Sequence, residues 1–225
     1  MPQRIKTKEL LADALKQLMA DASIEQLGIQ QICDVCGVHR KTFYYYFQNK
    51  YDLLNWIFYH ECIEPLFRQK PESFEKAVES IVRKVDLDRA FYTNAFRIAP
   101  ETCFGNTFSN SFQDYFIEQV KELLILYGLP HLPQPHLVEK ETYETYYTDT
   151  LAGSLMGNVQ QWLLEQPQLS VEQYLELLKT TSCFQKRKCT SEEERSAQKG
   201  LFFPFRRGGI ALLGRQGLWY TFSET

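Results

Sequence analysis

The chain has 225 residues, of which 44% are hydrophobic and 24% charged, and this composition is typical of a soluble globular protein. Its formal net charge of -3 offers no global attraction to phosphate, so binding of nucleic acid would require a locally basic surface. The sequence has no apolar run after its first residues and none of membrane-spanning length, and its six cysteines lack the framework of a small secreted domain. We therefore expect a cytoplasmic protein that does not contact membranes.

The first predicted element is an amphipathic helix over Arg4–Met19. Apolar residues recur along it at the spacing of one helical face, as Leu10, Leu11, Ala14, Leu15 and Leu18 show. The cations of the first sixty residues gather at the extreme N-terminus and again around Arg40, Lys41 and Lys50. Any local basic surface should therefore lie in this part of the chain.

The second feature is the segment Ile29–Lys50, which reads as two short helices joined by a tight turn. Gly37 lies between the two apolar runs, where a residue that adopts positive φ allows a sharp reversal. Cys33 is small enough for the second helix to approach the first closely. This pattern predicts a helix-turn-helix, whose second helix, beginning at Val38, would fit the major groove of DNA.

Helical periodicity continues through the rest of the chain as far as the tail. A helix from Asn49 should kink or end at Pro65, and later helices are predicted over Phe74–Val85, Asp88–Ile98, Phe112–Tyr127, Glu141–Leu164 and Ser170–Leu178. The last of these opens with capping-box spacing at Ser170 and Gln173. We predict an all-α fold with an N-terminal three-helix head at residues 1–50 and a helical body at residues 51–182. Residues 183–225 form a polar, then Gly- and aromatic-rich tail, for which disorder, a packed appendage and a basic arm all remain open.

The run GVHRKTFYYYFQNKYDLL resembles the DNA-binding head of the TetR family of transcriptional regulators. The resemblance covers roughly the first 65 residues and rests on Gly37-Val38, on Thr42–Phe47 and on Asn49-Lys50 with the following Asp52-Leu53-Leu54. The body is similar in outline to members related to the activator of dihydroxyacetone kinase genes. The resemblance implies a homodimer on a double-stranded DNA operator, an effector pocket in the body and no cofactor. The tail has no counterpart in this pattern.

The predicted recognition helix supplies the candidate DNA-binding residues. Arg40 can donate two hydrogen bonds to guanine, whereas Lys41 and Lys50 suit phosphate, and Thr42 suits a phosphate or a thymine methyl. Three successive aromatics cannot all face inward on one helix, so we expect Phe43, Tyr46 and Phe47 inside. The complete predicted set is His39, Arg40, Lys41, Thr42, Tyr44, Tyr45 and Lys50. By the resemblance, Thr42, Tyr44, Tyr45 and Lys50 match positions that contact DNA.

The pair Cys33 and Cys36 has the spacing of a metal or redox motif. A structural zinc needs four ligands, and no second pair lies nearby in the sequence, so packing of small residues is the preferred interpretation. No nucleophile or phosphate-loop motif is present either, and we expect neither an enzyme nor a metal site.

The body is expected to bind an effector and to form the dimer. Candidate pocket residues are Phe91, Phe96, Phe108 and Phe112. The candidate dimer interface lies on the last two helices, with apolar surface from Leu151, Leu155, Val159, Trp162, Tyr174 and Leu178. Gly153 and Gly157 would permit close approach of the second subunit. The effector could be a small molecule or a protein partner, and a small-molecule binding protein or enzyme on a helical scaffold is the remaining alternative.

Overall fold

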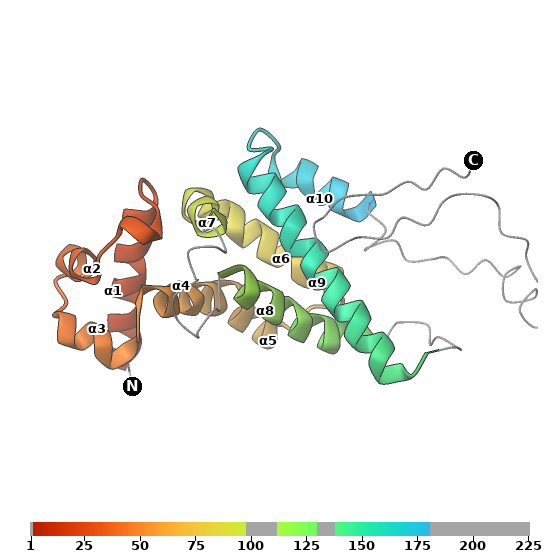
Figure 1. Cartoon of the computed structure of the whole chain (residues 1–225), viewed down its shortest axis with the longest axis horizontal. Coiled ribbons are helices and arrows are strands. Elements are labelled where there is room, and N and C mark those ends of the chain that lie inside the picture. Colours follow the sequence, from red (N-terminus) through yellow and green to blue (C-terminus); the bar gives the residue numbers. More distant parts are fainter. Residues whose placement is uncertain (1, 98–111, 130–137, 181–225) are drawn as a thin grey trace, which may run out of the picture. The chain divides into compact units, whose positions relative to one another are not determined.

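The computed structural model describes residues 2–97, 112–129 and 138–180, and these segments contain helices and no strand (Figure 1). The predicted all-α fold is confirmed. The tail at residues 183–225 and Phe108 lie outside the described residues. Within the described segments, no helix is both long and apolar enough to cross a membrane.

The head begins with α1 (Pro2–Met19), which is followed by a single 3-10 turn, η1 (Ile24–Gln26). The short helices α2 (Ile29–Cys36) and α3 (Arg40–Tyr46) come next. Most of the predicted apolar face of α1 packs inward, since Leu11, Ala14 and Leu15 are buried. The prediction that Leu10 lies on this face is wrong, because it is 42% exposed. Burial of this face supplies most of the stability of such short helices, because helices of this length are marginal alone.

A nearly continuous helical run leads from the head into the body. It comprises α4 (Lys50–Phe58), the π-helical turn η2 (Tyr59–Ile63) and α5 (Glu64–Gln69). Asn49 caps α4, its Oδ1 accepting hydrogen bonds at 2.9 Å from the backbone N–H groups of Tyr51 and Asp52. Pro65 was expected to kink or end this helix, but it lies in the first turn of α5, where its missing N–H is tolerated. The irregularity falls before it, where the Glu64 N–H donates to the carbonyl of Tyr59.

The remaining helices of the body are α6 (Phe74–Leu87), α7 (Arg89–Phe96), α8 (Phe112–Tyr127), α9 (Lys140–Leu164) and α10 (Val171–Thr180). Their bounds agree with the sequence prediction to within a few residues. The capping box of α10 is present: Ser170 Oγ accepts from the Gln173 N–H at 3.3 Å, and Gln173 Oε1 accepts from the Ser170 N–H at 2.9 Å. The long helix α9 packs along α8 and α7, and α10 packs against α6.

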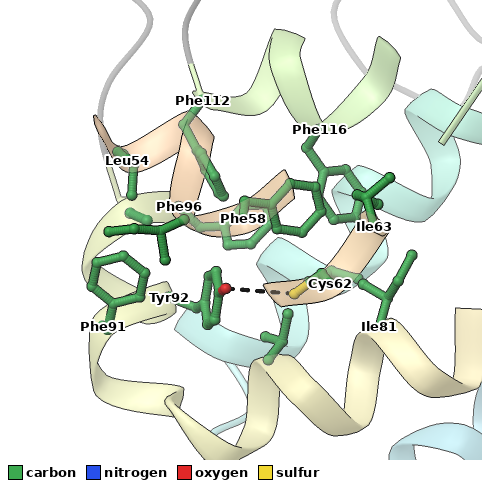
Figure 2. Packing of buried hydrophobic residues seen from close by; sticks show 14 of the residues in the cluster. Leu54, Phe58, Cys62, Ile63, Ile81, Phe91, Tyr92, Phe96, Phe112 and Phe116 are labelled. Carbon is green, nitrogen blue, oxygen red and sulfur yellow. Dashed lines mark hydrogen bonds between the residues drawn. The ribbon is translucent and has the colours of Figure 1, made fainter. Parts of the chain in front are cut away.

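Aromatic rings fill the centre of the body (Figure 2). Phe58, from α4, lies with its ring centroid 5.6 Å from that of Phe112 and 5.3 Å from that of Phe116, both on α8. Tyr92, on α7, contacts Phe58 and shares a hydrogen bond of 3.5 Å with the Cys62 thiol. Because Phe58 belongs to the helix that leaves the head, this cluster connects the position of α4 to the packing of the body.

Replacing Phe58 with alanine should lower the free energy of unfolding by about 3–5 kcal/mol, because it removes a fully buried ring from this cluster. Chemical denaturation followed by circular dichroism would measure the loss. The same replacement at Tyr45, whose ring is exposed, is the control and should change the free energy little. Equal losses in the two variants would contradict the role assigned to the cluster.

Candidate nucleic-acid interface

The turn between α2 and α3 is set by Gly37. Its φ is +67°, in the left-handed region that favours glycine, and its N–H donates to the Cys33 carbonyl at the end of α2. The Val38 N–H donates to the same carbonyl at 3.0 Å. Gly37 therefore reverses the chain between α2 and α3, as the sequence predicts.

Helix α3 begins at Arg40, two residues later than predicted. His39 is its N-cap: the ring Nδ1 accepts a hydrogen bond of 3.2 Å from the Lys41 N–H. Val38 lies before the cap and packs against the core. The correction matters because His39 stabilises the start of the helix while its ring remains exposed beside Arg40.

The aromatic run of α3 divides between the inside and the outside of the head. Phe43 and Phe47 are buried, and Phe47 packs edge-on against Trp56 of α4 at 5.8 Å between centroids. Tyr44 is 47% exposed and Tyr45 is 64% exposed. Phe43 and Phe47 therefore anchor α3, and their burial leaves both tyrosines facing solvent.

The exposed side of α3 contains a pre-formed pair. Arg40 Nη2 donates to the Tyr44 hydroxyl at 3.2 Å, and its guanidinium carbon lies 5.6 Å from the centre of the Tyr44 ring. This contact spans one helical turn and limits the directions in which Arg40 can point. Lys41 is also exposed, whereas Thr42 is half-buried, so the basic and aromatic groups gather on one side of the helix.

Lys50 is held by the head itself. Its Nζ donates to the carbonyl oxygens of Glu25 at 3.0 Å and Leu27 at 2.9 Å, which joins the start of α4 to the segment between α1 and α2. Burial lowers the pKa of this ammonium, against an opposing effect of the Glu25 charge. An ammonium has three donors, so one remains for an external acceptor such as phosphate.

Lys8 is a cation of the head that the sequence analysis did not single out. Its Nζ lies 5.2 Å from the centre of the Phe47 ring and 5.3 Å from that of Trp56, so α1 covers the contact that anchors α3. Nothing in the local sequence predicts this, since Lys8 and its two partners are far apart along the chain. Lys8 is accordingly assigned to the support of α3.

Cys33 and Cys36 are free thiols in the described part of the chain. Cys33 is buried between α2 and α3, and Cys36 Sγ donates to the Ile32 carbonyl at 3.2 Å. Burial raises the pKa of the Cys33 thiol. Within the described segments, no three His, Cys, Asp or Glu side chains are grouped closely enough to hold a metal ion. The geometry fits the interpretation of these cysteines as small packing residues.

Three of the predicted pocket residues share one cluster in the body. Phe91, Phe96 and Phe112 are all buried, and the Phe96 and Phe112 rings lie 5.1 Å apart between centroids (Figure 2). The Phe91 ring lies 4.9 Å from the Tyr92 ring between centroids, and all three phenylalanines are part of the core.

Most of the predicted dimer residues are buried within the protomer. Leu151 is only half-buried, but Leu155, Val159, Trp162, Tyr174 and Leu178 are buried within the protomer. Trp162 stacks on Tyr174 at 4.3 Å between centroids and donates from Nε1 to the Leu169 carbonyl. These side chains join α9 to α10 inside the protomer.

Comparison with known proteins relates the head to a large group of regulators. Residues 11–57 match the profile described as "Bacterial regulatory proteins, tetR family", a range that covers α2, α3 and most of α4. The chain is 29% identical over 126 residues to the HTH-type dhaKLM operon transcriptional activator DhaS of Lactococcus lactis subsp. lactis (strain IL1403). That alignment covers 55% of this chain and 62% of the relative.

Two solved structures share the fold of the body as well as the head. The dihydroxyacetone kinase operon activator DhaS matches with a TM-score of 0.54 at 21% identity, over 77% of this chain and 92% of that one. Native NalD, the secondary repressor of the MexAB-OprM multidrug efflux pump in Pseudomonas aeruginosa, matches with a TM-score of 0.52 at 19% identity. This second match covers 77% of this chain and 93% of NalD.

Replacing Lys50 with methionine should lower the free energy of unfolding by about 1 kcal/mol, because two backbone carbonyls lose their donor. Urea denaturation would measure the change. Lys41→Met removes the same charge from an exposed position and should leave the stability nearly unchanged. If the two variants unfold at the same urea concentration, Lys50 does not support the head.

Proposed function

We propose that the protein is a transcriptional regulator of the tetR family, whose profile its head matches, and that it binds a pseudo-palindromic operator as a homodimer under effector control. The observation that carries the proposal is the outward side of α3, where Arg40, Lys41, Tyr44 and Tyr45 are exposed together. A short helix with this side free fits the major groove of DNA. Because the net charge of the chain is negative, attraction to DNA would depend on the local arrangement of cations on and around α3.

Within the interface, the residues have different proposed roles. Arg40 reads a guanine through its two forked donors, and Tyr44 keeps the guanidinium directed along the helix. Lys41, Thr42, Tyr45 and the remaining donor of Lys50 contact the phosphate backbone and set the register, together with His39 at the start of α3. The two heads of a dimer would occupy successive major grooves about one helical turn apart.

The homodimer is proposed to form through the outer side of α9. Gly153 and Gly157 lie there one turn apart, and a Cβ added at either would meet no atom of the described residues within 4 Å other than the backbone of α9 itself. Glycine inside a helix costs about 1 kcal/mol relative to alanine, and neither backbone shape nor packing within the protomer requires it here. Close approach of a second helix would offset that cost. Tyr146, 71% exposed on α9, and Leu177, 50% exposed on α10, would add apolar contact area.

Effector control is proposed to act through the aromatic cluster of the body. The cluster is formed by rings in contact, so a ligand that enters it must displace some of them. Phe58 is among them and belongs to α4, so such a displacement would move the helix that carries the head. A ligand changes the DNA affinity only by its differential affinity for the two arrangements. A protein effector docked on the body would act under the same rule.

Selection of bound fragments from genomic DNA would test the function directly and reveal the operator. We expect a short pseudo-palindromic sequence whose half-sites lie about one helical turn apart. Failure of the purified protein to retain any fragment at low salt would overturn the proposal. It would favour a small-molecule binding protein or enzyme on a helical scaffold.

Arg40→Ala should weaken binding to the selected operator by about ten- to a hundredfold and relax the preference at one base position of each half-site. Titration of labelled operator, with every base substituted in turn at that position, would measure both effects. Arg68→Ala removes the same charge from an exposed position on α5 and serves as the control. An unchanged base preference in the Arg40 variant would contradict its assignment.

Gly157→Leu should convert the dimer to a monomer, because the new side chain would fill the space through which the second helix approaches. The protomer should stay folded, since the added Cβ meets open space within it. Sedimentation velocity would measure the oligomeric state, and circular dichroism would measure the helix content. Gln17→Leu adds a leucine at an exposed position of α1 and should leave the dimer intact. A dimer that tolerates Gly157→Leu would place the interface elsewhere.

A further inference from the structure

A group of four charges links the head to the body at a second place besides α4. The Lys16 ammonium, in the last turn of α1, lies 2.9 Å from a carboxylate oxygen of Glu61 and 2.7 Å from one of Asp88. Lys84 lies 3.3 Å from Glu61 and 3.6 Å from Asp88. Positive and negative groups thus alternate around the cluster, and all four side chains are less than one third exposed.

The four residues come from elements that are far apart in the sequence. Lys16 belongs to the head, Glu61 lies in the π-helical turn that extends α4, and Lys84 lies on α6. Asp88 occupies the corner between α6 and α7. Lys16 is therefore the member through which the head joins the cluster.

Asp88 makes this link at a local cost. It occupies the N-cap position of α7, where aspartate is among the best residues for capping, yet its side chain makes no capping hydrogen bond. Its carboxylate is directed to Lys16 and Lys84 instead. A side-chain cap would stabilise the start of α7, so this arrangement loses local helix stability and gains a contact with α1.

A second contact joins the same two helices. Asn94, on α7, donates from Nδ2 to the carbonyl oxygen of Met19 at 2.6 Å. Met19 is the last residue of α1, where carbonyls lack partners within the helix. Lys16 and Asn94 thus attach the end of α1 to the beginning and the last turn of α7.

We propose that α1 is a second lever between body and head, attached to the α6–α7 corner through Lys16–Asp88 and through Asn94 with the Met19 carbonyl. The same helix, α7, carries Phe91, Tyr92 and Phe96 of the aromatic cluster (Figure 2). A rearrangement of these rings therefore moves the head through α1 as well as through α4. The effect on DNA binding rests on the proposed function, whereas the attachment of α1 to the α6–α7 corner does not.

The attachment is tested without DNA by native-state hydrogen exchange. Lys16→Met should raise the exchange of head amides in α1–α3 by about fivefold relative to body amides in α8 and α9, because opening of the head no longer breaks two ion pairs. Lys84→Met is the matched control: it removes one cation from the same cluster but leaves both head–body contacts in place. Lys16→Arg should restore the slow exchange of the head.

Two outcomes would overturn the proposal: an unchanged head-to-body ratio in Lys16→Met, or the same change in Lys84→Met. Should Lys16→Met fail to fold, Asn94→Ala removes the other attachment without disturbing the charges and must shift the ratio in the same direction.

Binding to DNA then tests the consequence. Lys16→Met should weaken binding to the complete operator by about fivefold and leave binding to a single half-site unchanged, because only the complete site requires both heads in a fixed orientation. An equal loss of affinity for the complete operator and for the half-site would contradict the proposal that α1 sets the orientation of the head. If the unmodified protein binds no DNA, the proposed function fails, and the exchange experiment still decides whether α1 is attached.

Discussion

The burial of Phe43 and Phe47 is the interaction on which the rest of the head depends. Helix α3 has only seven residues, and a helix of that length is not stable by itself in water. It persists because two rings on one side are buried against α2 and α4 and because Gly37 and His39 close its beginning. The same burial leaves Arg40, Tyr44 and Tyr45 on the side that faces away from the protein. The burial that anchors α3 therefore also determines which of its side chains are exposed.

The support of α3 extends well beyond its own contacts. Lys8 of α1 covers the Phe47 and Trp56 rings, and Lys50 ties the start of α4 to two carbonyls after α1. Lys8 and Lys50 belong to the basic residues of the head, which charge alone would suggest as DNA contacts. Both of them stabilise the packing of the head. The exposed side of α3 is correspondingly small, so under the proposed function few side chains would discriminate between bases.

On α9, the buried side carries large apolar residues and the outer side carries two glycines. Trp162 and Tyr174 hold α9 to α10 within the protomer, and the opposite side of α9 carries Gly153 and Gly157 in open space. The aromatic cluster, the α6–α7 corner and the end of α1 are consecutive neighbours, so packing in the body and orientation of the head are physically continuous. The proposed effector control requires this continuity.

The sequence by itself determined the features that depend on neighbours within one or two helical turns. The positions of the helices, the reversal at Gly37, the capping box at Ser170 and the division of the tyrosine run into inner and outer residues all follow from local spacing. The tertiary structure decided which of two plausible sides of α9 packs inward, where the α4 run becomes π-helical and which partners Lys16 and Lys50 find. Those partners lie 23 to 72 residues away, and no local pattern encodes them because they are brought together only when helices from distant parts of the chain pack.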